Sequence, residues 1–172
     1  MKRIIVIPIT IIFFIFLVGC TQKSRIENLP KPKTISTYYD NISSSYTYGI
    51  SIYEEGYEKL RKIKIKSSSH EEFLDRAMKV QSSVDDSLLV YYDAMEEQLR
   101  YSIATNLDPQ CKVLNSLEDL ENKMEMAEEK FEWIYSEKIP VGNESSLKLA
   151  ELAFRLKQSS SEIQRINALL GK

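Results

Sequence analysis

Apolar residues recur at intervals of three and four along much of this chain, and that spacing constrains its fold more than any other feature. Three series of this kind are present, and each predicts a helix with one buried face. The first is Leu74, Ala77, Val84, Leu88, Tyr91, Met95 and Leu99, with Gln81 on the same face; the second, with heptad steps, is Val113, Leu117, Leu120, Met124, Ala127, Phe131 and Ile134; the third is Leu149, Leu152, Leu156, Ile163, Ile166 and Leu170.

Residues that are typical of helix ends separate these series. Capping boxes predict a helix over 69–106, an N-cap aspartate followed by proline starts the next helix, proline and glycine end it, and a polar residue caps the last helix, which a glycine closes. In chain order these signals are Ser68 with Glu71, Ser69 with Glu72, Asp108 with Pro109, Pro140 with Gly142, Asn143 or Ser145 or Ser146, and Gly171.

Residues 35–66 fit two patterns. Helical spacing is followed by Ile35, Tyr39, Ile42, Tyr46, Gly49, Tyr53, Tyr57 and Leu60, whereas strand-like alternation is followed by Tyr46, Tyr48, Ile50 and Ile52, and by Ile63 and Ile65. We favour the helix because a lone hairpin would have few strand partners. The predicted fold is all-α, an antiparallel bundle of three to four long helices over residues 35–172, with a three-helix bundle preceded by a β or irregular arm as the alternative. The heptad spacing also allows helices to pair between chains, so the sequence is compatible with a homo-oligomer.

The first twenty residues carry a targeting signal. Lys2 and Arg3 precede an almost unbroken apolar run, Ile4 to Val18. As a helix this run would span about 22 Å, which is short for a bilayer core of about 30 Å and typical of the apolar region of a signal peptide.

The residues that end this run, Leu17-Val18-Gly19-Cys20, resemble the lipobox of bacterial lipoproteins. The resemblance implies a signal peptide over 1–19, cleavage between Gly19 and Cys20, and lipid attachment at Cys20, with acylation of the new amino group. We therefore expect an exported protein anchored by lipid, in the outer membrane of a Gram-negative cell or otherwise on the outer face of the cell membrane. Residues 20–34, with Pro30 and Pro32, are expected to form an extended tether.

Tyrosines are concentrated between residues 38 and 57. They cannot all face one core from one helix, and exposed tyrosines suit protein contacts. We therefore name as candidate partner contacts Tyr38, Tyr39, Tyr46, Tyr48 and Tyr53, the alternative being half-buried packing with hydroxyls in water.

Nothing in the sequence resembles a catalytic or metal-binding motif. Cys111, at the start of a predicted helix, and His70, the single histidine, are isolated, so no catalytic residue, metal site or cofactor is predicted. Carboxylates form a ridge over Glu118–Glu132 and basic residues a run over Lys59–Lys66, both expected to be solvated or to pair with each other. Without residues 1–19 the charge is 21 − 25 = −4, which argues against nucleic-acid binding.

These features predict a lipid-anchored, non-enzymatic protein of the cell envelope that acts as an adaptor or assembly module. Its expected partners are the membrane, through the lipid at Cys20, and an envelope protein. Two alternatives are a small-ligand-binding lipoprotein, with a site near Trp133 and Tyr135, and a structural homo-oligomer that spaces envelope layers.

Overall fold

The computed structural model describes residues 22–23 and 25–169, and all regular structure within them is helical, as predicted. The helix expected over residues 35–66 is confirmed and the strand alternative is wrong. The signal peptide, Gly19, Cys20, Leu170 and Gly171 lie outside the described residues. The helices are α2 (Ile35–Lys66), α3 (His70–Thr105), α4 (Lys112–Ser116), α5 (Glu118–Trp133) and α6 (Glu144–Leu169).

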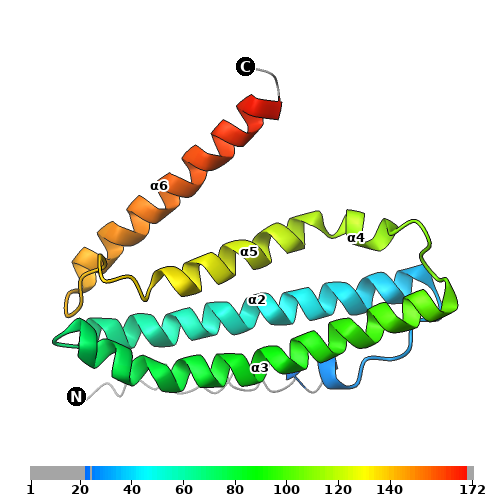
Figure 1. Ribbon diagram of the computed structural model, residues 1–172, viewed down its shortest axis with the longest axis horizontal. Coiled ribbons are helices and arrows are strands. Elements are labelled where there is room, and N and C mark those ends of the chain that lie inside the picture. The colour runs from blue at the N-terminus through cyan, green and yellow to red at the C-terminus, as the bar shows by residue number, and fades with distance from the viewer. Residues whose placement is uncertain (1–21, 24, 170–172) are drawn as a thin grey trace, which may run out of the picture. The chain divides into compact units, whose positions relative to one another are not determined.

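The described residues form two compact units, which we treat separately. Unit 1 comprises the residues up to Glu55 together with Ser82–Glu129, and unit 2 comprises Gly56–Gln81 together with the chain from Lys130 onward. Each unit therefore contains a part of α2 and a part of α3, and the two long helices run side by side (Figure 1).

In unit 1 the helices pack through a broad face of α2. Residue pairs along α2 and α3 run in opposite directions: Asn41 bonds Gln98, whereas the Tyr46 ring lies 6.3 Å from that of Tyr91. Helix α5 packs against the same region at Gly49. A Cβ atom added there would lie 2.8 Å from Cε of Met124, so glycine permits the close approach of α5.

The segment before α2 packs on unit 1. Ile26 and Pro32 are buried, and the side-chain amide of Asn41 donates a 2.7 Å hydrogen bond to the Pro30 carbonyl. Thr34 then starts α2, its hydroxyl accepting a bond from the Thr37 amide. Residues 25–34, which were expected to be part of an extended tether, thus lie against unit 1, and residues 25–27 are helical.

The helix predicted to begin at Asp108-Pro109 begins later and is broken. Asp108 does cap it, since its carboxylate accepts 2.9 Å bonds from the amides of Lys112 and Val113, but the first helical residue is Lys112. Cys111, expected inside the first turn, precedes it in the left-handed region at φ 51°. Leu117 leaves helical geometry and separates α4 from α5. The heptad series continues across the break and its main members are buried, namely Val113, Leu117, Met124, Phe131 and Ile134.

We expect Asp108→Ala to lower the free energy of unfolding by about 1–2 kcal/mol, because two amides of α4 would lose their acceptor. Urea denaturation followed by circular dichroism measures this change. Asp119→Ala is the control, because that exposed carboxylate makes a surface ion pair with Lys123 and caps nothing. Equal effects of the two substitutions would contradict the capping role.

In unit 2 a short connection joins α2 to α3. The Ser69 hydroxyl accepts a bond from the Glu72 amide, and the Glu72 carboxylate accepts bonds from the amide and hydroxyl of Ser68, which lower the pKa of Glu72. Ser69 therefore caps the helix at Glu72 as predicted, but the Glu72 carboxylate bonds Ser68 rather than Ser69, and Ser68 pairs with Glu72 rather than with Glu71. Phe73, rather than the expected Leu74, is the buried residue that follows.

Residues 134–143 connect α5 to α6 in unit 2. Gly142 has φ 76°, its amide donates to the Lys64 carbonyl, and a Cβ atom there would lie 3.1 Å from the Ser67 carbonyl oxygen. Asn143 is the residue that caps α6, since its side-chain oxygen accepts bonds from the amides of Ser145 and Ser146. A glycine and an asparagine thus fix the direction in which α6 starts.

The face that α6 buries differs from the predicted one. Leu147 is fully buried, and the ring of Phe154 lies 4.9 Å from that of Trp133. The predicted stripe is exposed at each of its residues whose side chain is described, which are Leu149, Leu152, Leu156 and Ile163. The prediction was wrong because α6 carries apolar residues on two sides, and its neighbours in unit 2 contact only the side with Leu147 and Phe154, in the first half of the helix.

Candidate contact surface

The tyrosines named as partner contacts are mostly core residues. Tyr38, Tyr46, Tyr48 and Tyr53 are all buried, and only Tyr39 is exposed, at 38%. The expectation that they form an exposed surface is therefore wrong for four of the five. Helix α2 is contacted by α3 at Tyr46, by α5 at Gly49 and by the preceding segment at Asn41, so a wider arc of it is buried than one apolar stripe would suggest.

Two of these buried tyrosines reach carboxylates at the edge of unit 1. The Tyr53 hydroxyl donates a 3.4 Å bond to Glu128, and Tyr46 bonds Glu121 in the same way. Burial raises the pKa of both phenols, and the neighbouring carboxylates raise it further. Both phenols are therefore neutral donors at physiological pH, and part of the predicted acidic ridge serves to bond them.

The basic run over Lys59–Lys66 does not form a continuous surface. Lys64 is fully buried in unit 2, where its ammonium donates to the carbonyls of Ile134 (2.5 Å) and Ser136 (3.0 Å). These carbonyls follow the last residue of α5, where a helix carries partial negative charge. The ammonium also lies 4.7 Å from the centre of the Phe73 ring. Burial lowers the pKa of Lys64 to about 8.

Polar contacts hold the first half of α6 in unit 2. Arg61 pairs with Glu144 (3.2 Å) and Glu151 (3.5 Å) of α6, and the Tyr57 hydroxyl donates a short hydrogen bond to Glu151. The ammonium of Lys130 lies over the face of the Tyr57 ring, 4.1 Å from the ring centre. We call these contacts of Tyr57, Arg61, Glu144, Glu151 and Lys130 the Tyr57 network. The network fixes which side of α6 faces the rest of unit 2.

The aromatic residues proposed to line a ligand site pack against other side chains. Trp133 stacks on Phe154, and Tyr135 packs between Phe73 and Phe131 while its hydroxyl donates to Gln81 at 2.9 Å. Each ring thus has a packing role within unit 2.

Cys111 belongs to unit 1 and His70 to unit 2. Cys111 is exposed in unit 1 and forms no disulfide. The His70 ring packs 5.8 Å from that of Phe73, and its Nδ1 atom is buried without a hydrogen-bond partner. In the described part of the chain, no cluster of histidine, cysteine, aspartate and glutamate could hold a metal ion.

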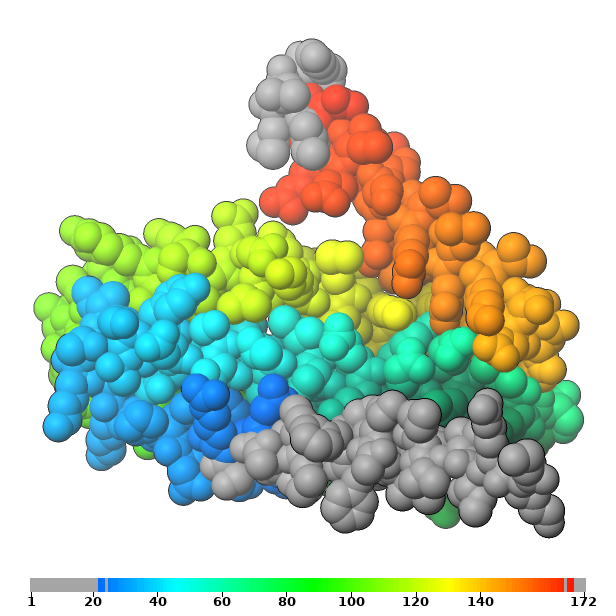
Figure 2. All heavy atoms as spheres, turned by 180° about the vertical axis from the view of Figure 1, so that it is seen from behind, coloured from blue at the N-terminus to red at the C-terminus, as the bar shows by residue number. Residues whose placement is uncertain are grey.

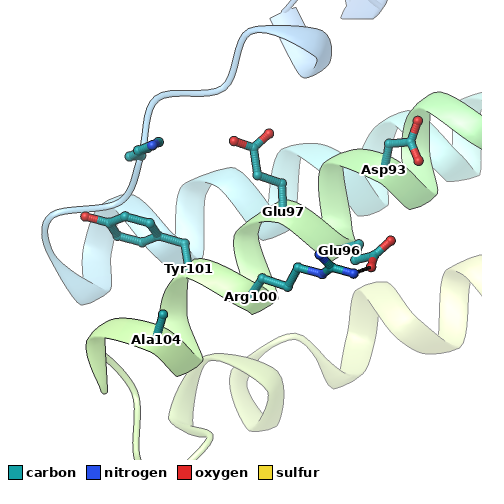
Figure 3. A pocket seen from close by; sticks show the side chains of 7 residues that line it. Asp93, Glu96, Glu97, Arg100, Tyr101 and Ala104 are labelled. Carbon is teal, nitrogen blue, oxygen red and sulfur yellow. Dashed lines mark ion pairs between the residues drawn. The ribbon is translucent and has the colours of Figure 1, made fainter.

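A shallow hollow lies along the outer side of α3 in unit 1 (Figure 3). It is lined by Lys31, Asp93, Glu96, Glu97, Arg100, Tyr101 and Ala104. The charges of Arg100 and Glu96 compensate each other across a 2.6 Å ion pair, and both side chains are mostly exposed. A ligand in this hollow would therefore meet solvated side chains of both charges and no enclosed polar group.

The outer face of α6, defined by Leu149, Leu152, Leu156 and Ile163, is the most regular exposed apolar feature of unit 2. These side chains are 55–69% exposed, although three of them are leucines. At about 100° per residue they lie roughly opposite Leu147 and Phe154. Helix α6 is the orange to red segment in Figure 2, and all four side chains of this face are exposed. Contiguous exposed apolar surface of this kind marks contact sites.

Among the described helices, none combines the length and the apolar content that crossing a membrane requires. No family model, no curated protein and no solved structure matches the chain significantly.

Proposed function

We propose that this chain is a lipid-anchored protein of the cell envelope, built as a bundle of three to four helices, that acts without catalysis by binding a protein partner through the outer face of α6. The exposure of four large aliphatic side chains at helical spacing on a single face carries the proposal. An amphipathic helix of this type binds a partner through residues spaced by three, four and seven positions.

The position of this face supports a contact role. The Tyr57 network and the Asn143 cap hold the first half of α6, so the part of the outer face around Leu149 and Leu152 is presented in a fixed orientation. A rigid apolar face loses little conformational entropy when a partner binds it. The lipobox residues ending at Cys20 supply the other part of the proposal, because a membrane anchor raises the local concentration of the module next to other membrane-bound proteins.

The test is a crosslinked affinity purification from native membranes. We expect wild type to recover a stoichiometric partner, Cys20→Ser to recover less of it, and the double substitution Leu152→Glu/Leu156→Glu to recover at least about tenfold less, because two charges would enter the apolar contact.

Ile103→Glu is the matched control. Ile103 lies on α3 and is 79% exposed, but it does not belong to the outer face of α6. Circular dichroism of each variant checks that helical content is unchanged. If the α6 variant recovers as much partner as Ile103→Glu does, the outer face of α6 is not the contact surface and the proposal fails.

A further inference from the structure

The rim of the outer face of α6 carries two opposite charges one heptad apart. Arg155 and Glu162 are exposed, and neither has an ion-pair partner among the residues that the structure describes. The series Leu149, Leu152, Leu156, Ser159 and Ile163 alternates steps of three and four, and Arg155 and Glu162 each precede a member of it by one residue. This is the flanking position at which coiled-coil helices place their interhelical charges.

Ser159 is the one polar member of this series. Its hydroxyl donates a 3.1 Å hydrogen bond to the Arg155 carbonyl, one turn earlier in α6. The hydroxyl can therefore be covered by an apolar partner without losing its hydrogen bond. The small side chain also leaves room opposite it for a large one.

We propose that the outer face of α6 binds α6 of a second copy of this chain in antiparallel orientation. The two-fold register places Arg155 against Glu162 of the second copy, and Glu162 against Arg155 of the second copy. In the same register Leu152 packs against Ile163 of the second copy. Leu156 packs against Ser159 of the second copy, whose small side chain leaves room for it. This inference rests on the proposed function, since it names the partner of the same surface.

Charge complementarity selects this register over its neighbours. A shift of one heptad in one direction places Arg155 against Arg155 of the second copy, and a shift in the other direction places Glu162 against Glu162. In a parallel pair, Arg155 and Glu162 would face Ser160 and Asn167, which are uncharged. Only the antiparallel register described above forms two attractive pairs, and its two-fold symmetry closes the assembly at a dimer.

The experiment is a charge exchange in the full chain, purified from membranes in mild detergent. Sedimentation equilibrium at low salt measures the dimer dissociation constant. We expect Arg155→Glu alone and Glu162→Arg alone each to raise it roughly tenfold, because each creates two repulsive pairs. The double variant Arg155→Glu/Glu162→Arg should return to within about twofold of wild type, because both attractive pairs are re-formed with reversed polarity.

Lys157→Glu is the matched control, because Lys157 is an exposed residue of the same helix that lies off the contact rim, and it should leave the dissociation constant unchanged. A wild-type chain that stays monomeric, or a double variant as weak as the single ones, would overturn the inference. If such a monomer still captures another protein through the outer face of α6, the proposed function survives this result. If neither capture nor self-association depends on that face, both fail.

Discussion

The stability of unit 2 should increase as the pH is raised from 7 to 9.5, by about 2 kcal/mol, and Lys64→Met should abolish the increase. Lys64 is fully buried and its pKa is lowered to about 8, against an ordinary value of 10.5. Between pH 8 and pH 10.5 the unfolded chain keeps the proton on this residue, whereas the folded chain has largely released it. Raising the pH therefore favours the folded state, because Lys64 releases its proton at a lower pH in the folded chain than in the unfolded chain.

The surroundings of Lys64 explain why burial dominates. Its ammonium faces the carbonyls of Ile134 and Ser136 and the ring of Phe73, and within the described residues no carboxylate forms an ion pair with it. Carbonyl dipoles and a ring face stabilise the charged form less than bulk water does. Buried tyrosines act in the opposite direction above pH 10: burial raises the pKa of Tyr57, so folding becomes less favourable where the unfolded phenol ionises.

Urea denaturation at a series of pH values, followed by tryptophan fluorescence, tests this prediction. Trp133 is the only tryptophan, and it stacks on Phe154 within unit 2, so its signal reports on that unit. Lys62→Met is the matched control, since Lys62 is exposed on the same helix and should keep the wild-type profile. Parallel profiles for Lys64→Met and wild type would show that Lys64 stays protonated and is not the source of the dependence.

Periodicity predicted the helices because an amphipathic pattern reports directly on burial. The series from Val113 to Ile134 is mostly buried even though the helix is interrupted at Leu117, and periodicity alone does not reveal that interruption. The late start of α4 follows from local geometry: Asp108 caps the chain four residues ahead of Lys112, and Cys111 takes a left-handed conformation that a sequence pattern does not encode.

Sequence reasoning failed where a helix had more than one apolar side. On α2 it expected exposed tyrosines, but α3, α5 and the segment before α2 together cover a wide arc of that helix, and Tyr38 and Tyr48 are buried. On α6 it chose the aliphatic series over the side with Leu147 and Phe154. The contacts that select the inner side are long-range, since Arg61 of α2 pairs with Glu144 and Glu151, and the pattern of α6 alone does not reveal them.

We expect Asn41→Leu to lower the free energy of unfolding of unit 1 by about 2–4 kcal/mol. The buried Asn41 amide donates to the Pro30 carbonyl at 2.7 Å and to the Gln98 side-chain oxygen at 2.8 Å. Leucine has a similar volume but no donor, so the Gln98 amide, itself only 2% exposed, would be left buried without its partner. Thermal unfolding followed by circular dichroism measures the loss.

The double variant Asn41→Leu/Gln98→Leu separates the polar penalty from a packing defect. Removing both polar groups leaves no buried side-chain amide unpaired, so we expect it to recover most of the stability that Asn41→Leu loses. A double variant as unstable as Asn41→Leu would show instead that the leucine at position 41 does not fit.

The same hydrogen bonds should hold the segment that leads toward the proposed anchor. Pro30 is bonded through Asn41, and Ile26 is buried, so residues 25–34 stay on unit 1. Both leucine variants lose the donor to Pro30, and trypsin should therefore cleave after Arg25 faster in both than in wild type. If the chain is lipidated at Cys20, the five residues to Arg25 reach at most about 17 Å, and a docked segment keeps unit 1 close to the membrane. Equal cleavage rates in all three proteins would mean that burial of Ile26 alone holds the segment.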